Sequence, residues 1–123
     1  MQESQAKGIR DLEILRGHGY EYRLLLYTPS LWELTVQAYE ADPKGHFYRI
    51  IFHGTHYMQT AIHWIQGDFE LATPEKYAKL ADALHLTTEE RERLLLFVAS
   101  PPNKPEVLVL CHAVYVSQEI PLP

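Results

Sequence analysis

The chain has 123 residues, of which 46% are hydrophobic and 22% are charged, and its formal net charge is -5. This length is typical of one domain with one core, so we expect a single domain over residues 1–123 in which residues 1–8 form a frayed end. The apolar runs are far shorter than the roughly 18 residues of a membrane-spanning helix, and the polar start lacks a signal-peptide pattern, so we expect a cytoplasmic protein with no membrane partner. The 11 basic residues are spread along the chain, which argues against nucleic acid as a partner.

The first expected elements are a short helix and a β-hairpin. The stretch GIRDLEILRGHG suits a helix closed by Gly17, although LEIL followed by RGHG also suits a strand that enters a turn. The stretches YEYRLLLY and LWELTVQAYE are rich in strand-forming residues and are separated by residues 28–30, which predicts a hairpin with a three-residue loop. A turn is expected at residues 42–45, where proline and glycine occur together.

A second hairpin is expected around Gly54. The stretch HFYRIIFH reads as a strand, and a Gly-Thr pair suits a tight two-residue turn, after which the chain would return as a strand over residues 56–66. Phe52 would then lie opposite Tyr57, and both faces of the hairpin would carry aromatic and apolar side chains. Because helices would cover one face of the sheet only, we expect some of these side chains to be exposed. The predicted interface residues are Tyr48, Phe52, Tyr57 and Trp64.

The same hairpin would place His53 and His56 opposite each other at its neck. Two histidines whose Cα atoms lie about 5.5 Å apart could share a transition-metal ion with a third group from elsewhere. The sequence supplies no acidic residue or cysteine at a typical ligand spacing, so solvent-exposed turn histidines are the favoured interpretation and a metal site at His53 and His56 is the alternative.

A helical hairpin is expected over residues 74–98, after a second tight turn at residues 66–69 and a short strand, FELA. Thr73 can cap the first helix, with Pro74 at its first position, and Thr87 and Glu90 have the spacing of a capping box. A final strand over residues 107–118 is apolar enough to be central in the sheet, and it contains Cys111, the one cysteine, which we expect to be a buried free thiol.

The segment MQTAIHWIQGDFELATPEKYAKLADALHLTTEERERLL resembles the latter part of a repressor-type helix-turn-helix domain. The resemblance implies a recognition helix that ends near Gly67, a proline-capped helix PEKYAKLADAL and a further helix. It also implies a DNA-binding transcriptional regulator that uses residues 58–98. The stretch that would enter the major groove, from Met58 to Gly67, contains no lysine or arginine.

The sequence predicts no catalytic residues and no cofactor. Cys111 and His112 are neighbours in an expected strand and would point to opposite faces, and the chain has no glycine-rich phosphate loop. A general acid built from His46 or His63 beside Tyr48 is a catalytic arrangement that the pattern allows.

The predicted fold is therefore α+β, a mostly antiparallel sheet of five or six strands with a two-helix hairpin packed on one face. The predicted function is a non-catalytic module that binds a protein partner or its own copy, as a homodimer in the second case. A DNA-binding regulator and a histidine metal-binding protein are the alternatives.

Overall fold

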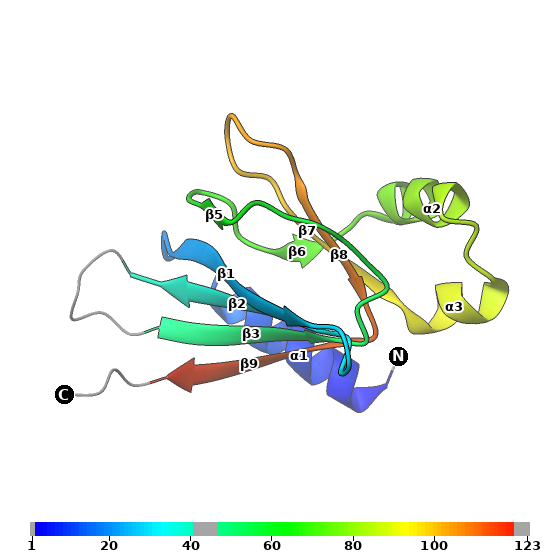
Figure 1. Cartoon of the computed structure of the whole chain (residues 1–123), viewed down its shortest axis with the longest axis horizontal. Coiled ribbons are helices and arrows are strands. Elements are labelled where there is room, and N and C mark those ends of the chain that lie inside the picture. The colour runs from blue at the N-terminus through cyan, green and yellow to red at the C-terminus, as the bar shows by residue number, and fades with distance from the viewer. Residues whose placement is uncertain (1, 41–46, 120–123) are drawn as a thin grey trace.

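The structure is a computed structural model that describes residues 2–40 and 47–119. The described residues form three helices and nine strands, which follow one another as shown in Figure 1. Their bounds are α1 Glu3–Ile14, β1 Glu21–Thr28, β2 Glu33–Tyr39, β3 Phe47–His53, β4 Tyr57–Gln59, β5 His63–Trp64, β6 Glu70–Leu71, α2 Pro74–Ala83, α3 Thr88–Arg93, β7 Leu95–Ala99, β8 Val107–Cys111 and β9 Ala113–Glu119.

The strands form two sheets rather than one. A five-stranded sheet has the order β5-β1-β2-β3-β9, a four-stranded sheet has the order β4-β8-β7-β6, and all the pairs are antiparallel. The α+β class and its antiparallel character are confirmed, as is the first hairpin, in which β1 pairs with β2. Its loop spans residues 29–32 rather than the predicted 28–30. The predicted turn at residues 42–45 lies outside the described residues.

The chain passes from one sheet to the other at two adjacent points, Gly54 and His112. Only His112 separates β8 from β9, and its backbone N–H donates to the carbonyl of His53 at 2.9 Å. Gly54 has a φ of +65°, and a Cβ at this position would lie 2.9 Å from the Cβ of His112. The two crossings therefore pack directly on each other. Both the positive φ of residue 54 and the lack of room for a Cβ there require glycine.

The predicted hairpin at Gly54 is wrong. Phe52 pairs with Leu34 and Val114, and not with Tyr57, which pairs with Leu110 in the other sheet. The physical reason is that β3 already has β2 on one side and β9 on the other, so it has no free edge for the following segment. The predicted single strand over residues 107–118 is also wrong, because His112 separates two strands, β8 and β9, that belong to different sheets.

The main core lies between the two sheets and is closed by α1. Its largest buried side chains are aromatic: Tyr22, Phe52, Trp64, Phe69 and Phe97. The ring of Tyr22 stacks on Trp64 with centroids 5.4 Å apart, and its hydroxyl donates to Asp68 at 2.6 Å. Burial and this hydrogen bond raise the pKa of Tyr22. The network fixes the ring and leaves the buried hydroxyl satisfied, which makes it structural.

The first helix begins earlier than expected. Residues 3–8 belong to α1, so the prediction of a frayed end is wrong for them. Gln5 is buried, and its side-chain amide donates to the carbonyls of Arg93 and His112 at 3.0 and 2.7 Å. Gly8 lies directly against the carbonyl oxygen of Val114, where a Cβ would come within 2.0 Å. These contacts with distant parts of the chain hold the helix end in place, and local sequence signals do not reveal them.

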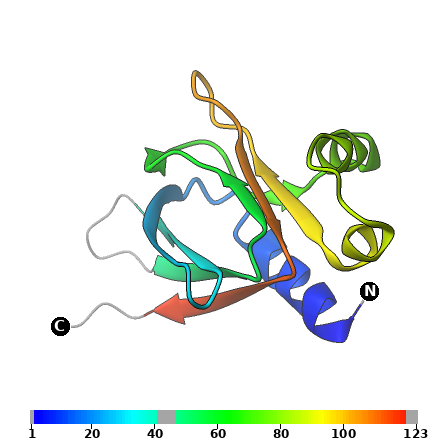
Figure 2. The ribbon, with the colours of Figure 1, turned by 45° about the vertical axis from the view of Figure 1, so that its right-hand side comes forward.

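The helical hairpin is confirmed, but it is shorter than expected. Thr73 accepts a hydrogen bond from Lys76 N at 3.2 Å, and Thr87 and Glu90 form the predicted capping box. The second helix ends at Arg93, because residues 95–99 pair with β8 as strand β7. The two helices lie beyond the four-stranded sheet, as Figure 2 shows, and cover its outer face. A second buried cluster fills this contact: Leu94, Leu96, Val98 and Leu110, with Tyr57, Tyr77, Leu80, Leu84, Leu86 and Leu108 packed against it.

Candidate protein-binding surface

The outer face of the five-stranded sheet has no helix packed on it in the described part of the chain. The register of the strands sorts its side chains into rows, because alternate residues of a strand point to the same side. One row consists of Arg23, Gln37, Arg49 and Ser117, and the next consists of Glu21, Tyr39, Phe47 and Glu119. This half of the face is polar and charged, as expected for a sheet that faces water on one side.

The polar side chains of this charged half form hydrogen bonds with one another. Arg23 donates to the side-chain oxygen of Gln37 at 3.0 and 2.6 Å, and its guanidinium carbon lies 5.2 Å from the ring centre of Tyr39. Glu21 accepts hydrogen bonds from His63 and Tyr39, each at 3.0 Å, and these bonds lower the pKa of its carboxyl. These groups have local partners, so the charged half is an ordinary solvated surface.

The half of the face near the β1–β2 loop contains exposed apolar side chains next to the pair of Glu33 and His53. Here Leu26, Thr35, Ile51 and Tyr115 form one row across four strands. The exposed fraction is 51% for Leu26 and 48% for Tyr115. The loop that follows adds Leu31 at 58% and Trp32 at 54%. Large apolar side chains at this level of exposure gain little from the fold of the chain itself.

Trp32 is held in an unusual conformation. Its φ is +52°, in the left-handed region that disfavours a residue with a Cβ by about 1–2 kcal/mol. Its carbonyl accepts from Thr55 N at 2.9 Å, its N–H donates to Pro29 O at 3.3 Å, and its ring meets the edge of His56 at 5.7 Å between centroids. The backbone bonds fix the loop in this strained shape and place a half-exposed indole on the surface. A strained, exposed aromatic residue is a reason to look for a function at this position.

The two histidines of the predicted metal site flank Trp32. His53 Nδ1 lies 3.4 Å from a carboxylate oxygen of Glu33, and its ring centre lies 6.3 Å from that of Tyr115. His56 Nδ1 lies 3.0 Å from the carbonyl oxygen of Gly54. Within residues 2–40 and 47–119, no group of three or more His, Cys, Asp or Glu side chains is arranged to hold a metal ion. Metal binding by His53 and His56 therefore stays a prediction. The described residues provide no third ligand beside them.

We define the tip surface as Leu26, Leu31, Trp32, His53, His56 and Tyr115. Sequence reasoning missed its centre, because the pattern predicts a loop at residues 28–30 and places Leu31 and Trp32 at the start of the following strand, whereas β2 begins at Glu33 and both residues belong to the loop. The sequence LW directly after Thr-Pro-Ser could have indicated it, since a turn has no reason of its own to expose leucine and tryptophan.

The predicted interface residues do not form this surface. Phe52 and Trp64 have exposed fractions of 0%, so their prediction as interface residues is wrong: both side chains fill the core between the sheets. Tyr48 and Tyr57 are half-buried and lie apart, with Tyr48 against Tyr20 and Tyr57 beneath the helical hairpin. Their role in an interface stays a prediction. His63 and Tyr48 lie on opposite faces of the five-stranded sheet, so these two residues do not form the suggested general-acid arrangement. His46, the other histidine suggested for it, lies outside the described residues.

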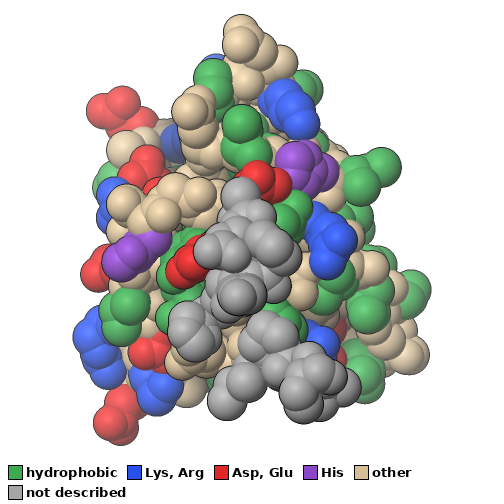
Figure 3. Space-filling view, turned by 90° about the vertical axis from the view of Figure 1, so that its left-hand side faces the viewer, with side chains coloured by type: hydrophobic (Ala, Val, Ile, Leu, Met, Phe, Trp, Pro, Cys, Tyr) green, Lys and Arg blue, Asp and Glu red, His purple; other side chains and the backbone are tan. Residues whose placement is uncertain are grey.

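The segment that resembles a recognition helix is extended. Residues 57–59 and 63–64 are strands β4 and β5, and no residue from 57 to 67 is helical. On the end of the molecule shown in Figure 3, basic and acidic side chains are interspersed, and neither kind gathers into a patch. The chain thus offers neither the helix nor, on this face, the clustered positive charge on which DNA recognition depends.

Cys111 is a buried free thiol, as predicted, and its burial raises its pKa, which keeps the group protonated and unreactive. No helix in the described ranges is both long enough and apolar enough to span a membrane. Comparisons with protein-family models, with curated proteins and with solved structures find no match.

Proposed function

We propose that this protein is a non-catalytic interaction module that associates with a second copy of itself through the tip surface. The observation that carries the proposal is Trp32, an indole that is 54% exposed and is held at a φ of +52° by two backbone hydrogen bonds. Tryptophan is the residue type most enriched among those that dominate binding energy, and a fixed side chain loses little conformational entropy when it is bound.

A second copy is the partner that the charges favour. The tip surface contains no lysine, arginine, aspartate or glutamate, and Glu33 beside it is paired with His53. Two copies related by a twofold axis place like residues near each other, and a charged centre would then repel itself. An uncharged aromatic and aliphatic centre avoids this repulsion.

The area of the tip surface predicts a weak and reversible dimer. Four large side chains that are about half exposed leave on the order of 400 Å² of apolar surface in water per copy. A standard interface buries about 800 Å² per partner, so a dimer of this size lies at the low end of specific interfaces. We expect a dissociation constant on the order of tens to hundreds of micromolar.

Sedimentation velocity from about 10 µM to 1 mM tests this proposal. The wild-type chain should shift from monomer to dimer over this range, and Trp32→Ala should shift the midpoint upward at least tenfold, since removal of such a residue typically raises the binding free energy by 2 kcal/mol or more. Ile14→Ala removes a side chain with an exposed fraction of 64% from α1, and should leave the midpoint unchanged. A wild-type chain that stays monomeric at 1 mM, or equal midpoints for both variants, would overturn the proposal.

A further inference from the structure

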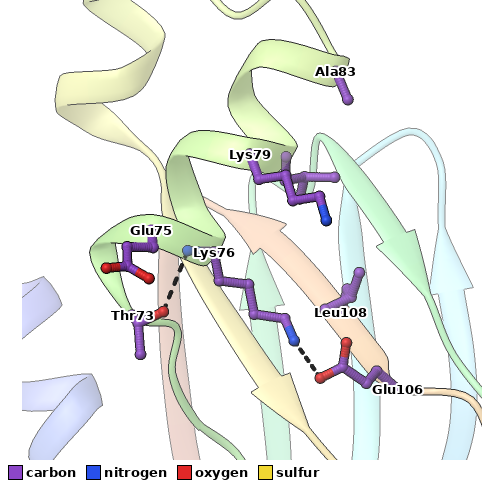
Figure 4. Close-up of a pocket in the computed structure, with 8 residues that line it drawn as sticks. Thr73, Glu75, Lys76, Lys79, Ala83, Glu106 and Leu108 are labelled. Carbon is purple, nitrogen blue, oxygen red and sulfur yellow. Dashed lines mark hydrogen bonds and ion pairs between the residues drawn. The ribbon is translucent and has the colours of Figure 1, made fainter.

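A second candidate site lies away from the tip surface, between α2 and the start of β8. It is a groove of about 630 Å³, shown in Figure 4. Its walls are Lys76, Lys79, Leu80 and Ala83 of α2 on one side and Glu106 and Leu108 on the other. The volume falls within the range of ligand-binding sites, and none of the lining residues belongs to the tip surface.

The floor of the groove is apolar. Leu80 and Leu108 belong to the cluster beneath the helical hairpin but are only half-buried, and Ala83 at the end of α2 is exposed. The helix therefore covers β8 incompletely at this point. An apolar side chain from a ligand would find leucine on both sides and would remove this surface from water.

The charge above the floor is unevenly compensated. Lys76 forms an ion pair with Glu106. Lys79 extends into the groove in Figure 4 and forms no ion pair with any side chain of residues 2–40 or 47–119. Glu75 also lines the groove, one turn before Lys79 on α2, but its carboxylate points away from Lys79 in Figure 4 and the two form no ion pair. The formal charges of the two lysines and two glutamates of the lining sum to zero, and Lys79 is the lysine of the lining that has no ion pair with a described residue.

We propose that this groove binds an extended peptide segment of another protein, with an apolar side chain on Leu80 and Leu108 and a neighbouring carboxylate at Lys79. The carboxylate complements the free ammonium group, and the apolar residue complements the floor. A peptide is favoured over an enclosed small molecule because Thr73, Glu75, Lys79 and Ala83 are exposed along the rim, so the groove is open along its length. This site does not depend on the dimer proposed above.

The competing explanation is that the lysines only shield the chain's own leucines. A lysine stem can cover apolar surface while its ammonium group stays in water, without any ligand. In that case the groove has no preference for negative charge in a peptide, and this difference is what the experiment measures.

The test uses the full chain and three blocked tripeptides: acetyl-Leu-Asp-Leu-amide, acetyl-Leu-Asn-Leu-amide and acetyl-Leu-Lys-Leu-amide. Methyl resonances of Leu80, Ala83 and Leu108 are followed by NMR during titration. We expect the aspartate peptide to bind with a dissociation constant on the order of 1 mM. We also expect it to bind about three- to fivefold more tightly than the lysine peptide, as a solvent-exposed ion pair allows. The asparagine peptide should fall between the two.

Two pairs of variants complete the test. Lys79→Glu should reverse the order of the aspartate and lysine peptides, whereas Lys7→Glu on α1 should not. Ala83→Trp should fill the groove and weaken the aspartate peptide at least fivefold, whereas Ala78→Trp, an exposed position on α2 outside the groove, should leave binding unchanged. Equal affinity for the aspartate and lysine peptides, an order that Lys79→Glu does not reverse, or methyl shifts that persist in Ala83→Trp would overturn the proposal.

Discussion

The two sheets differ in what covers their outer faces. On the four-stranded sheet, Leu96, Val98 and Leu110 face outward and are buried beneath α2 and α3. On the five-stranded sheet, Leu26 and Tyr115 face outward and stay about half exposed, because no helix lies over them in the described residues. Part of the uncovered face thus carries large apolar side chains as the covered face does, but their surroundings differ. The apolar residues of one stabilise the chain itself, and those of the other remain free for contact with another molecule.

Matched leucine substitutions should show the largest difference between the two faces. We expect Leu96→Ala to lower the free energy of unfolding by about 3 kcal/mol, since it leaves a cavity beneath the helices. Leu26→Ala on the uncovered face should change it by less than about 0.5 kcal/mol. Urea unfolding followed by circular dichroism measures both. Similar losses for the two variants would mean that the uncovered face is covered in solution, as it would be in a tight dimer.

The helices that cover the four-stranded sheet are stabilised by their N-terminal caps. Thr87→Ala removes the hydroxyl that accepts from Glu90 N at 3.1 Å, and we expect a loss of about 1 kcal/mol. Thr88→Ala, at the next position, removes no cap and is the control. If both variants unfold at the same urea concentration as the wild type, α3 does not contribute to the stability of the four-stranded sheet.

Trp32 should behave as a residue kept for contact rather than for stability. Glycine tolerates a φ of +52° and alanine does not, so Trp32→Gly should be more stable than Trp32→Ala by about 0.5–1 kcal/mol. Differential scanning calorimetry at low concentration, where the chain is monomeric, compares the two variants. A glycine variant that is the less stable of the two would show that this loop is not strained.

The smallest effect concerns pH and the charged half of the uncovered face. The hydrogen bond from His63, and secondarily that from Tyr39, lowers the pKa of Glu21 below its ordinary value of 4.5. A carboxyl whose pKa is lower in the folded state contributes stability that is present above its unfolded-state pKa and is lost as pH falls through the folded-state pKa. Glu21→Gln should therefore reduce the acid sensitivity of the urea midpoint below pH 5. Tyr39→Phe should reduce it less, because His63 makes the larger contribution.

Local signals predicted the parts of the fold that are locally determined. The caps at Thr73 and Thr87 and the β1–β2 hairpin each depend on residues close together in the sequence, and each is confirmed. The predicted hairpin at Gly54 is wrong although Gly54 does adopt a positive φ, because a hairpin needs a free edge of β3 and residues 113–119 occupy that edge. Pairing across more than 60 residues leaves no mark in a short window of sequence.

The candidate sites were harder to predict than the fold. Phe52 and Trp64 attracted attention because they are aromatic, yet aromatic residues in strands serve the core first. Trp32 lies in a loop where its exposure follows from a positive φ that no propensity assigns to tryptophan. The groove of Lys79 depends on how far α2 extends over β8, which is a matter of packing rather than of sequence pattern.

His112 is the only residue between β8 and β9, so the direction in which side chains alternate along β8 determines how they alternate along β9. A strand that slips by one position turns each of its side chains to the opposite side. One additional residue beside His112 would therefore direct Val114 and Val116 toward water and Tyr115 toward the interior, while β8 kept its place. Length variation at this joint is thus far more restricted than its position near the surface suggests, and natural insertions should be found at other connections of the chain.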